Sequence, residues 1–88
     1  MKIKEGFVLR EVAGQTIVIA VGEASKSFHG IINLNNTGKE IWEGVQKGMN
    51  EDLIAKKLTE KYEVSFSKAQ EDVDRLIRKM YEAGVMEV

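Results

Sequence analysis

The sequence has no cysteine and a single histidine, His29, among its 88 residues. Without cysteine the chain has no disulfides, thiolate metal sites or thiol nucleophiles, and it suits a reducing compartment. One imidazole cannot form a multi-histidine metal site or the usual Ser-His-Asp arrangement within one chain. The carboxylates are dispersed among lysines and arginines, as on solvated helix faces. We therefore expect no enzymatic activity, no cofactor and no metal.

Long apolar runs, phosphate-binding motifs and an excess of basic residues are also missing. No apolar stretch approaches the ~18 residues of a membrane-spanning helix, and residues 1–6 do not resemble a signal peptide. We therefore expect a cytoplasmic protein with no membrane partner. Thr37-Gly38-Lys39 lacks the upstream glycine loop of a phosphate-binding motif. The net charge is −1 and the pI is 5.8, which disfavours binding to nucleic acid.

The composition of the chain is that of an ordinary globular protein, with 43% hydrophobic and 31% charged residues. Its length predicts one domain over residues 1–88. Glycines and β-branched residues before residue 35 predict strands at about 7–12, 15–21 and 29–34, with a tight turn at Ala13-Gly14. The second strand is apolar on both faces, so we expect it to be covered on both sides or central in its sheet.

After residue 35 the apolar residues recur at helical spacing and predict helices at about 36–47, 51–63 and 68–83. Asn35 or Asn36, Asn50 and Ser67 are the expected N-caps. Gly48 and Gly84 are the expected stops. The expected apolar faces of the helices consist of Ile41, Trp42, Val45, Met49, Leu53, Ile54, Leu58, Tyr62, Ala69, Val73, Leu76, Ile77 and Met80.

Three strands followed by three helices predict an α+β, winged-helix-like fold. Because many winged-helix domains bind DNA, DNA binding through residues 68–83 is one hypothesis. The charges of this helix cancel, however, and a neutral helix supplies little affinity for phosphates. The four positive charges are those of Lys68, Arg75, Arg78 and Lys79, and the four negative charges are those of Glu71, Asp72, Asp74 and Glu82. A small dimerisation module that pairs through the third strand is a further alternative.

The stretch from Leu34 to Trp42, with its Leu-Asn-x-Thr-Gly-x-x-Ile-Trp pattern, resembles the PqqD family. Residues 6–10, 61–64, 72–73 and 83–85 are similar to other parts of that family, so the resemblance spans nearly the whole chain. It implies a chaperone that binds the leader segment of a ribosomally made precursor peptide. Such a chaperone presents the peptide to a modifying enzyme, often a radical S-adenosylmethionine enzyme. The product can be pyrroloquinoline quinone, a lasso peptide or another modified peptide.

The resemblance also implies that the leader is added as a strand beside the third strand, in a groove whose other wall is the third helix. An open strand edge supplies main-chain hydrogen bonds, and side-chain pockets supply selectivity. On the helix, Arg75 and Lys79 could pair with acidic leader residues and Asp72 with a basic one, whereas we expect Leu34 and Trp42 in the core. The candidate peptide-binding residues are His29, Ile31, Ile32, Asn33, Asp72, Arg75, Leu76 and Lys79.

Overall fold

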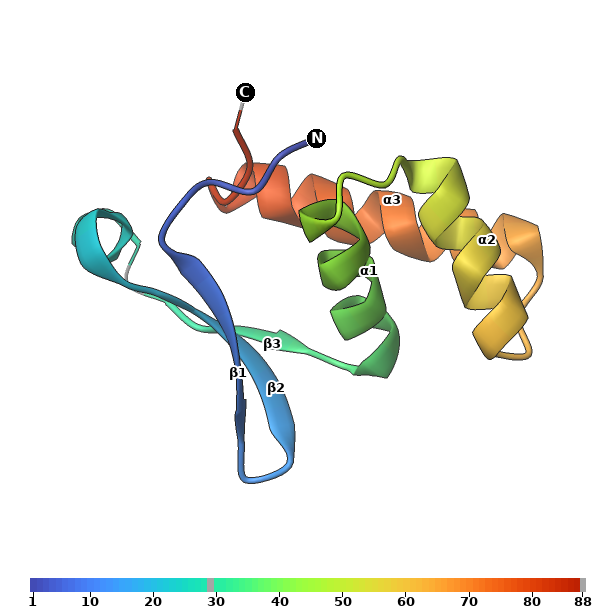
Figure 1. The fold of residues 1–88 in the computed structure, drawn as a ribbon, viewed down its shortest axis with the longest axis horizontal. Coiled ribbons are helices and arrows are strands. Elements are labelled where there is room, and N and C mark those ends of the chain that lie inside the picture. Colours follow the sequence, from blue (N-terminus) through green and yellow to red (C-terminus); the bar gives the residue numbers. More distant parts are fainter. Residues whose placement is uncertain (29, 88) are drawn as a thin grey trace.

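A computed structural model describes residues 1–28 and 30–87 of the chain. The elements are β1 (Phe7–Val12), β2 (Gln15–Ala20), the 3-10 helix η1 (Gly22–Lys26), β3 (Ile32–Leu34), α1 (Asn36–Gln46), α2 (Glu51–Lys61) and α3 (Phe66–Glu82). The predicted α+β order of three strands followed by three helices is confirmed (Figure 1). Within the described residues, no helix is long and apolar enough to cross a membrane.

The three strands form one antiparallel sheet in the order β1-β2-β3. The β1–β2 hairpin turns at Ala13 and Gly14, which both have positive φ, at 53° and 78°. This combination is typical of the two-residue turns that match the twist of paired strands. The second strand is central in the sheet, which is one of the two predicted alternatives, and it is not covered on both faces. Val18 is 0% exposed, whereas Ile17 and Ile19 on the other face are only partly buried.

The third strand is shorter than its sequence predicts. It begins at Ile32 and pairs with β2 through Val18↔Ile32 and Thr16↔Leu34. The prediction that Ile31 belongs to the strand is wrong, and His29 lies outside the described residues. A physical reason lies upstream, where the ring of Phe28 packs edge-on against Phe7 with centroids 5.2 Å apart. This contact holds Phe28, which follows η1, against β1, and the pairing with β2 begins four residues later, at Ile32.

Side-chain caps define the starts of the three helices. Asn35 caps α1 and Asn50 caps α2, and each side chain accepts a hydrogen bond from the backbone three residues later. The predicted cap of α3 at Ser67 is wrong: the helix starts at Phe66, and Ser65 accepts the N–H of Lys68 at 3.1 Å. Since serine is equally suited to both positions, local sequence alone does not choose between them.

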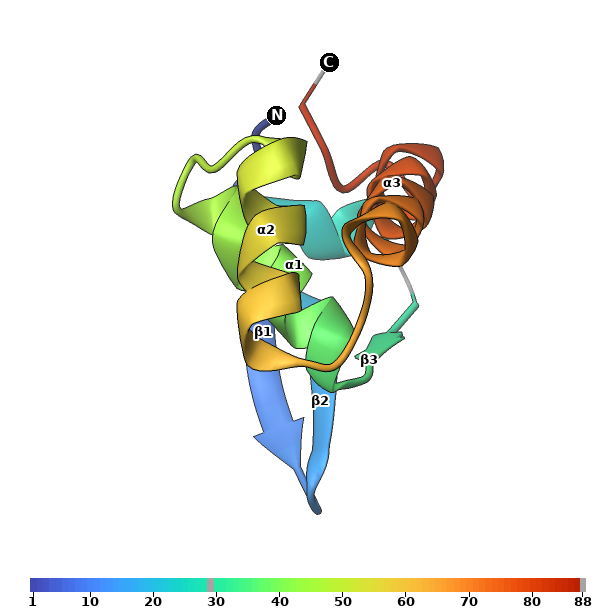
Figure 2. The same ribbon diagram turned by 90° about the vertical axis from the view of Figure 1, so that its right-hand side faces the viewer.

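The core lies between the inner face of the sheet and the three helices. Trp42 is fully buried in it and Leu34 is 9% exposed, as predicted, whereas Leu53 is 44% exposed and does not belong to the buried face of α2. A close approach of α1 and α2 occurs at Gly44, where a Cβ atom would lie 2.8 Å from Cγ1 of Ile54. The absence of a side chain at Gly44 therefore allows α1 and α2 to pack tightly. The helix α3 covers the same core from another side (Figure 2).

Candidate functional site

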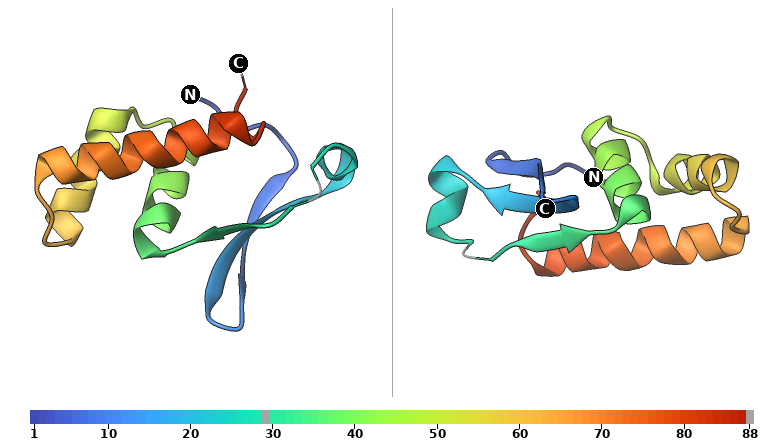
Figure 3. Two further views of the ribbon diagram at one scale, coloured as in Figure 1. Left: turned by 180° about the vertical axis from the view of Figure 1, so that it is seen from behind. Right: turned by 90° about the horizontal axis from the view of Figure 1, so that it is seen from below.

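A groove of about 830 Å³ runs between β3, the start of α1 and α3. β3 and α3 extend alongside each other on its two sides, as the view from below shows (Figure 3). The end of the β1–β2 hairpin closes part of it. The lining residues are Gly14, Gln15, Thr16, Asn33, Leu34, Asn35, Asn36, Thr37, Gly38, Ile41, Asp72, Arg75, Leu76 and Lys79.

The apolar part of this groove is small and is made by three elements. Leu34 from β3 and Ile41 from α1 belong to the buried core, and Leu76 from α3 is partly buried against it. We call these three residues the apolar floor. Polar side chains provide most of the remaining lining. A groove of this composition can hold an apolar side chain among groups that form hydrogen bonds.

One edge of β3 has no strand partner within the described residues, because β3 pairs only with β2. The backbone N–H and C=O groups on such an edge are free to pair with another extended chain. Asn33, at the centre of β3, is exposed and lines the groove. The groove therefore combines an open strand edge with an apolar floor.

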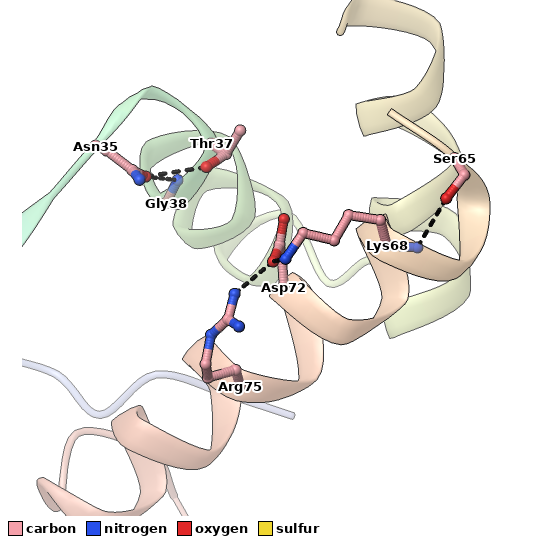
Figure 4. A network of polar contacts seen from close by, with 7 residues as sticks. All are labelled: Asn35, Thr37, Gly38, Ser65, Lys68, Asp72 and Arg75. Carbon is pink, nitrogen blue, oxygen red and sulfur yellow. Dashed lines mark hydrogen bonds and ion pairs between the residues drawn. The ribbon is translucent and has the colours of Figure 1, made fainter. Parts of the chain in front are cut away.

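The start of α1 is organised by Asn35. Its Oδ1 atom accepts hydrogen bonds from the N–H of Gly38 at 2.8 Å and from the hydroxyl of Thr37 at 3.0 Å (Figure 4). A Cβ atom on Gly38 would lie 3.1 Å from that same oxygen and 3.3 Å from Cδ2 of Leu34. The Asn-x-Thr-Gly pattern is therefore explained by the cap and by the tight packing of α1 on β3. These residues also line the groove, although the sequence predicted only the capping role.

On α3, Asp72 is held between two cations of the same helix. Its carboxylate accepts a hydrogen bond from Nζ of Lys68 at 3.0 Å and another from the guanidinium of Arg75 (Figure 4). The hydrogen bond from Lys68 is the main cause that lowers the pKa of Asp72; burial opposes it, and the positive charges of Lys68 and Arg75 lower the pKa further. Asp72 is therefore already paired, whereas Lys79 forms no ion pair within residues 1–28 and 30–87.

The structure brings five of the eight candidate residues together around the groove: Asn33, Asp72, Arg75, Leu76 and Lys79. Ile32 is partly buried against the core instead, and Ile31 is 61% exposed but does not line the groove. His29 is outside the described residues. Sequence reasoning missed the groove position of Ile41 and of the hairpin end at Gln15 and Thr16. Local sequence carries no signal for these positions because tertiary packing creates them.

The described part of the chain contains no group of three or more His, Cys, Asp or Glu side chains that could hold a metal ion. The described polar residues of the groove are amides, hydroxyls, one carboxylate and two cations. These groups can form hydrogen bonds and ion pairs with a ligand.

Residues 15–86 match the family model described as Coenzyme PQQ synthesis protein D (PqqD). No curated protein matches the chain. Two solved structures are similar to it: "TbiB1 in Complex with the TbiA(beta) Leader Peptide", with TM-score 0.78 and 17% identity, and "Lasso peptide synthetase B1 complexed with the leader peptide", with TM-score 0.77 and 18% identity. Each alignment covers 99% of this chain and 95% of the other. At this level of identity the two likenesses establish the fold.

Proposed function

The chain belongs to the PqqD family, and we propose that it binds the leader segment of a ribosomally made precursor peptide and presents that peptide to a modifying enzyme. In this role the chain holds its ligand without transforming it. The modifying enzyme is proposed to be of the radical S-adenosylmethionine type, and the cytoplasm is the proposed location.

The observation that carries this proposal is the open edge of β3 facing α3 across the groove. A peptide that is added to this edge would continue the sheet by one strand, with its main chain hydrogen-bonded to β3. Side chains of a strand alternate between its two faces, so every second peptide side chain would point into the groove. There it would meet the apolar floor and the polar side chains of α3.

The two similar structures support this assignment, since each is of a protein in complex with a leader peptide. The charge of α3 supports it as well. The side of α3 that faces the groove carries Asp72, Arg75 and Lys79, and Asp72 offsets one of the two cations. Because DNA affinity depends on neutralising several phosphates, this surface suits a peptide better than a duplex.

An NMR titration tests the proposal. The ¹⁵N-labelled chain is titrated with candidate leader peptides, and with a scrambled peptide of the same composition as the control for each. We expect saturable amide shifts in residues 32–34 and along residues 72–79 with the native leader only. Equal responses to both peptides, or shifts confined to α2, would refute the proposal. Shifts with a random DNA duplex that are lost with salt would favour DNA binding instead.

A further inference from the structure

The groove has an uneven distribution of charge that bears on the leader sequence it accepts. Among the described residues, its lining contains a single carboxylate, Asp72, and two cations, Arg75 and Lys79. Asp72 already receives hydrogen bonds from Arg75 and from Lys68. Arg75 therefore already has an ion-pair partner before a ligand arrives, although it shares that partner with Lys68.

Lys79 is in a different situation. It forms no ion pair within the described residues, even though Glu82 lies one turn further along α3. In the part of the chain that the structure describes, Asp72 is the one carboxylate that lines the groove with it. When a bound ligand displaces water from a cation, the loss of hydration costs free energy unless the ligand supplies a negative charge. The groove is thus complementary to a peptide that carries a carboxylate near Lys79.

From this complementarity we infer that Lys79 selects an acidic leader residue located two positions from the apolar leader residue on the floor. The inference rests on the proposed function. α3 advances about 1.5 Å per residue, so Lys79 lies roughly 4.5 Å beyond Leu76 along the axis. In an added strand, the next side chain on the same face lies about 6.6 Å away, and a lysine side chain easily spans the difference. The adjacent residue points to the opposite face and does not reach Lys79.

Charge reversal in both partners tests this inference. The probe is the fluorescein-labelled leader used in the titration, with Glu, Gln or Lys placed at each position in turn, and binding is followed by anisotropy at low salt. Alanine substitution first locates the apolar anchor of the peptide. We expect Glu to bind about 3- to 10-fold more tightly than Lys at one position two residues from this anchor, and not at the adjacent positions. The preference should shrink in about 0.5 M salt.

The variant Lys79→Glu should invert the preference at that one position, so that Lys becomes the favoured residue. Lys56→Glu is the matched control, because Lys56 is exposed on α2, forms no ion pair within the described residues and does not line the groove. Lys56→Glu should leave the preference unchanged. Lys79→Gln removes the positive charge without introducing a negative one, so it should abolish the preference without inverting it. Circular dichroism verifies that each variant is folded.

Two outcomes would overturn the inference while leaving the proposed function intact. In one, the leader binds but Lys79→Glu does not change the preference for Glu over Lys. In the other, Lys56→Glu inverts the preference as strongly, which would indicate a response to net charge. Failure of the unsubstituted leader to bind would instead refute the proposed function, and the inference with it.

Discussion

The partly buried Leu76 gives the sharpest quantitative prediction for peptide binding. It lines the groove from α3 and packs at the edge of the core, so part of its surface is free to contact a ligand. The variant Leu76→Ala removes three carbon groups from the apolar floor. At about 0.8 kcal/mol for each fully buried group, the complete effect of these carbons is about 2.4 kcal/mol.

Because Leu76 is only partly buried in the free chain, this effect divides between folding and binding. If roughly half of the side chain becomes buried under the peptide, binding should weaken by about 1.2 kcal/mol, or about eightfold in Kd. The remaining half should appear as about 1.2 kcal/mol of lost folding stability. The variant should therefore stay folded and bind less tightly.

Isothermal titration with the leader peptide measures the first quantity, and urea unfolding followed by tryptophan fluorescence measures the second. Leu53→Ala is the matched control, because the same three carbons are removed from a leucine that is 44% exposed on α2 and does not line the groove. Its Kd should equal that of the unmodified chain. An unchanged Kd for Leu76→Ala, or an equal loss in both variants, would refute the assignment of the floor.

Three further predictions concern folding stability, measured by urea unfolding. Asn35→Ala removes the cap that accepts the N–H of Gly38 and should cost about 1 kcal/mol; no loss would contradict the capping role. Asp72→Asn should reduce the acid sensitivity of the chain. The hydrogen bond from Lys68 lowers the pKa of Asp72, so the ionised carboxylate stabilises the folded chain at neutral pH. This stabilisation is lost as the pH falls below 3.8, the ordinary pKa of an aspartate, and through the lower pKa of the folded state. If Asp72→Asn loses as much folding stability at low pH as the unmodified chain, this prediction is contradicted. Gly44→Ala should destabilise by about 1–2 kcal/mol, because overpacking against Ile54 outweighs the gain in helix propensity; a stabilised variant would show that the helices move apart at little cost.

The general fold could be predicted from the sequence because its signals are local. The β-branched residues and the Ala13-Gly14 turn indicated the hairpin, and Asn50 marked the start of α2 where the structure has it. The start of β3 could not be predicted, because it depends on the contact between Phe28 and Phe7, which are far apart in the sequence. The start of α3 was misplaced because two serines offered the same capping chemistry.

The candidate site was predictable only where a single helix forms it. The spacing of Asp72, Arg75 and Lys79 placed them on one flank of a helix, and all three line the groove. The ion pairs of these residues were less evident. Lys68 forms an ion pair with Asp72, so a basic leader residue would have to compete with Lys68 for that carboxylate. The contribution of Ile41 requires α1, α3 and β3 to meet, and no local pattern encodes that meeting.

In the proposed complex, a leader peptide becomes a fourth strand on the open edge of β3. Intermolecular NOEs between the labelled chain and an unlabelled leader peptide report this pairing residue by residue. We expect backbone contacts between the peptide and residues 32–34 in a regular strand pattern, together with side-chain contacts to Leu76. A peptide whose NOEs lie on the opposite face of the sheet, at Ile17 and Ile19, or on α2, would contradict it.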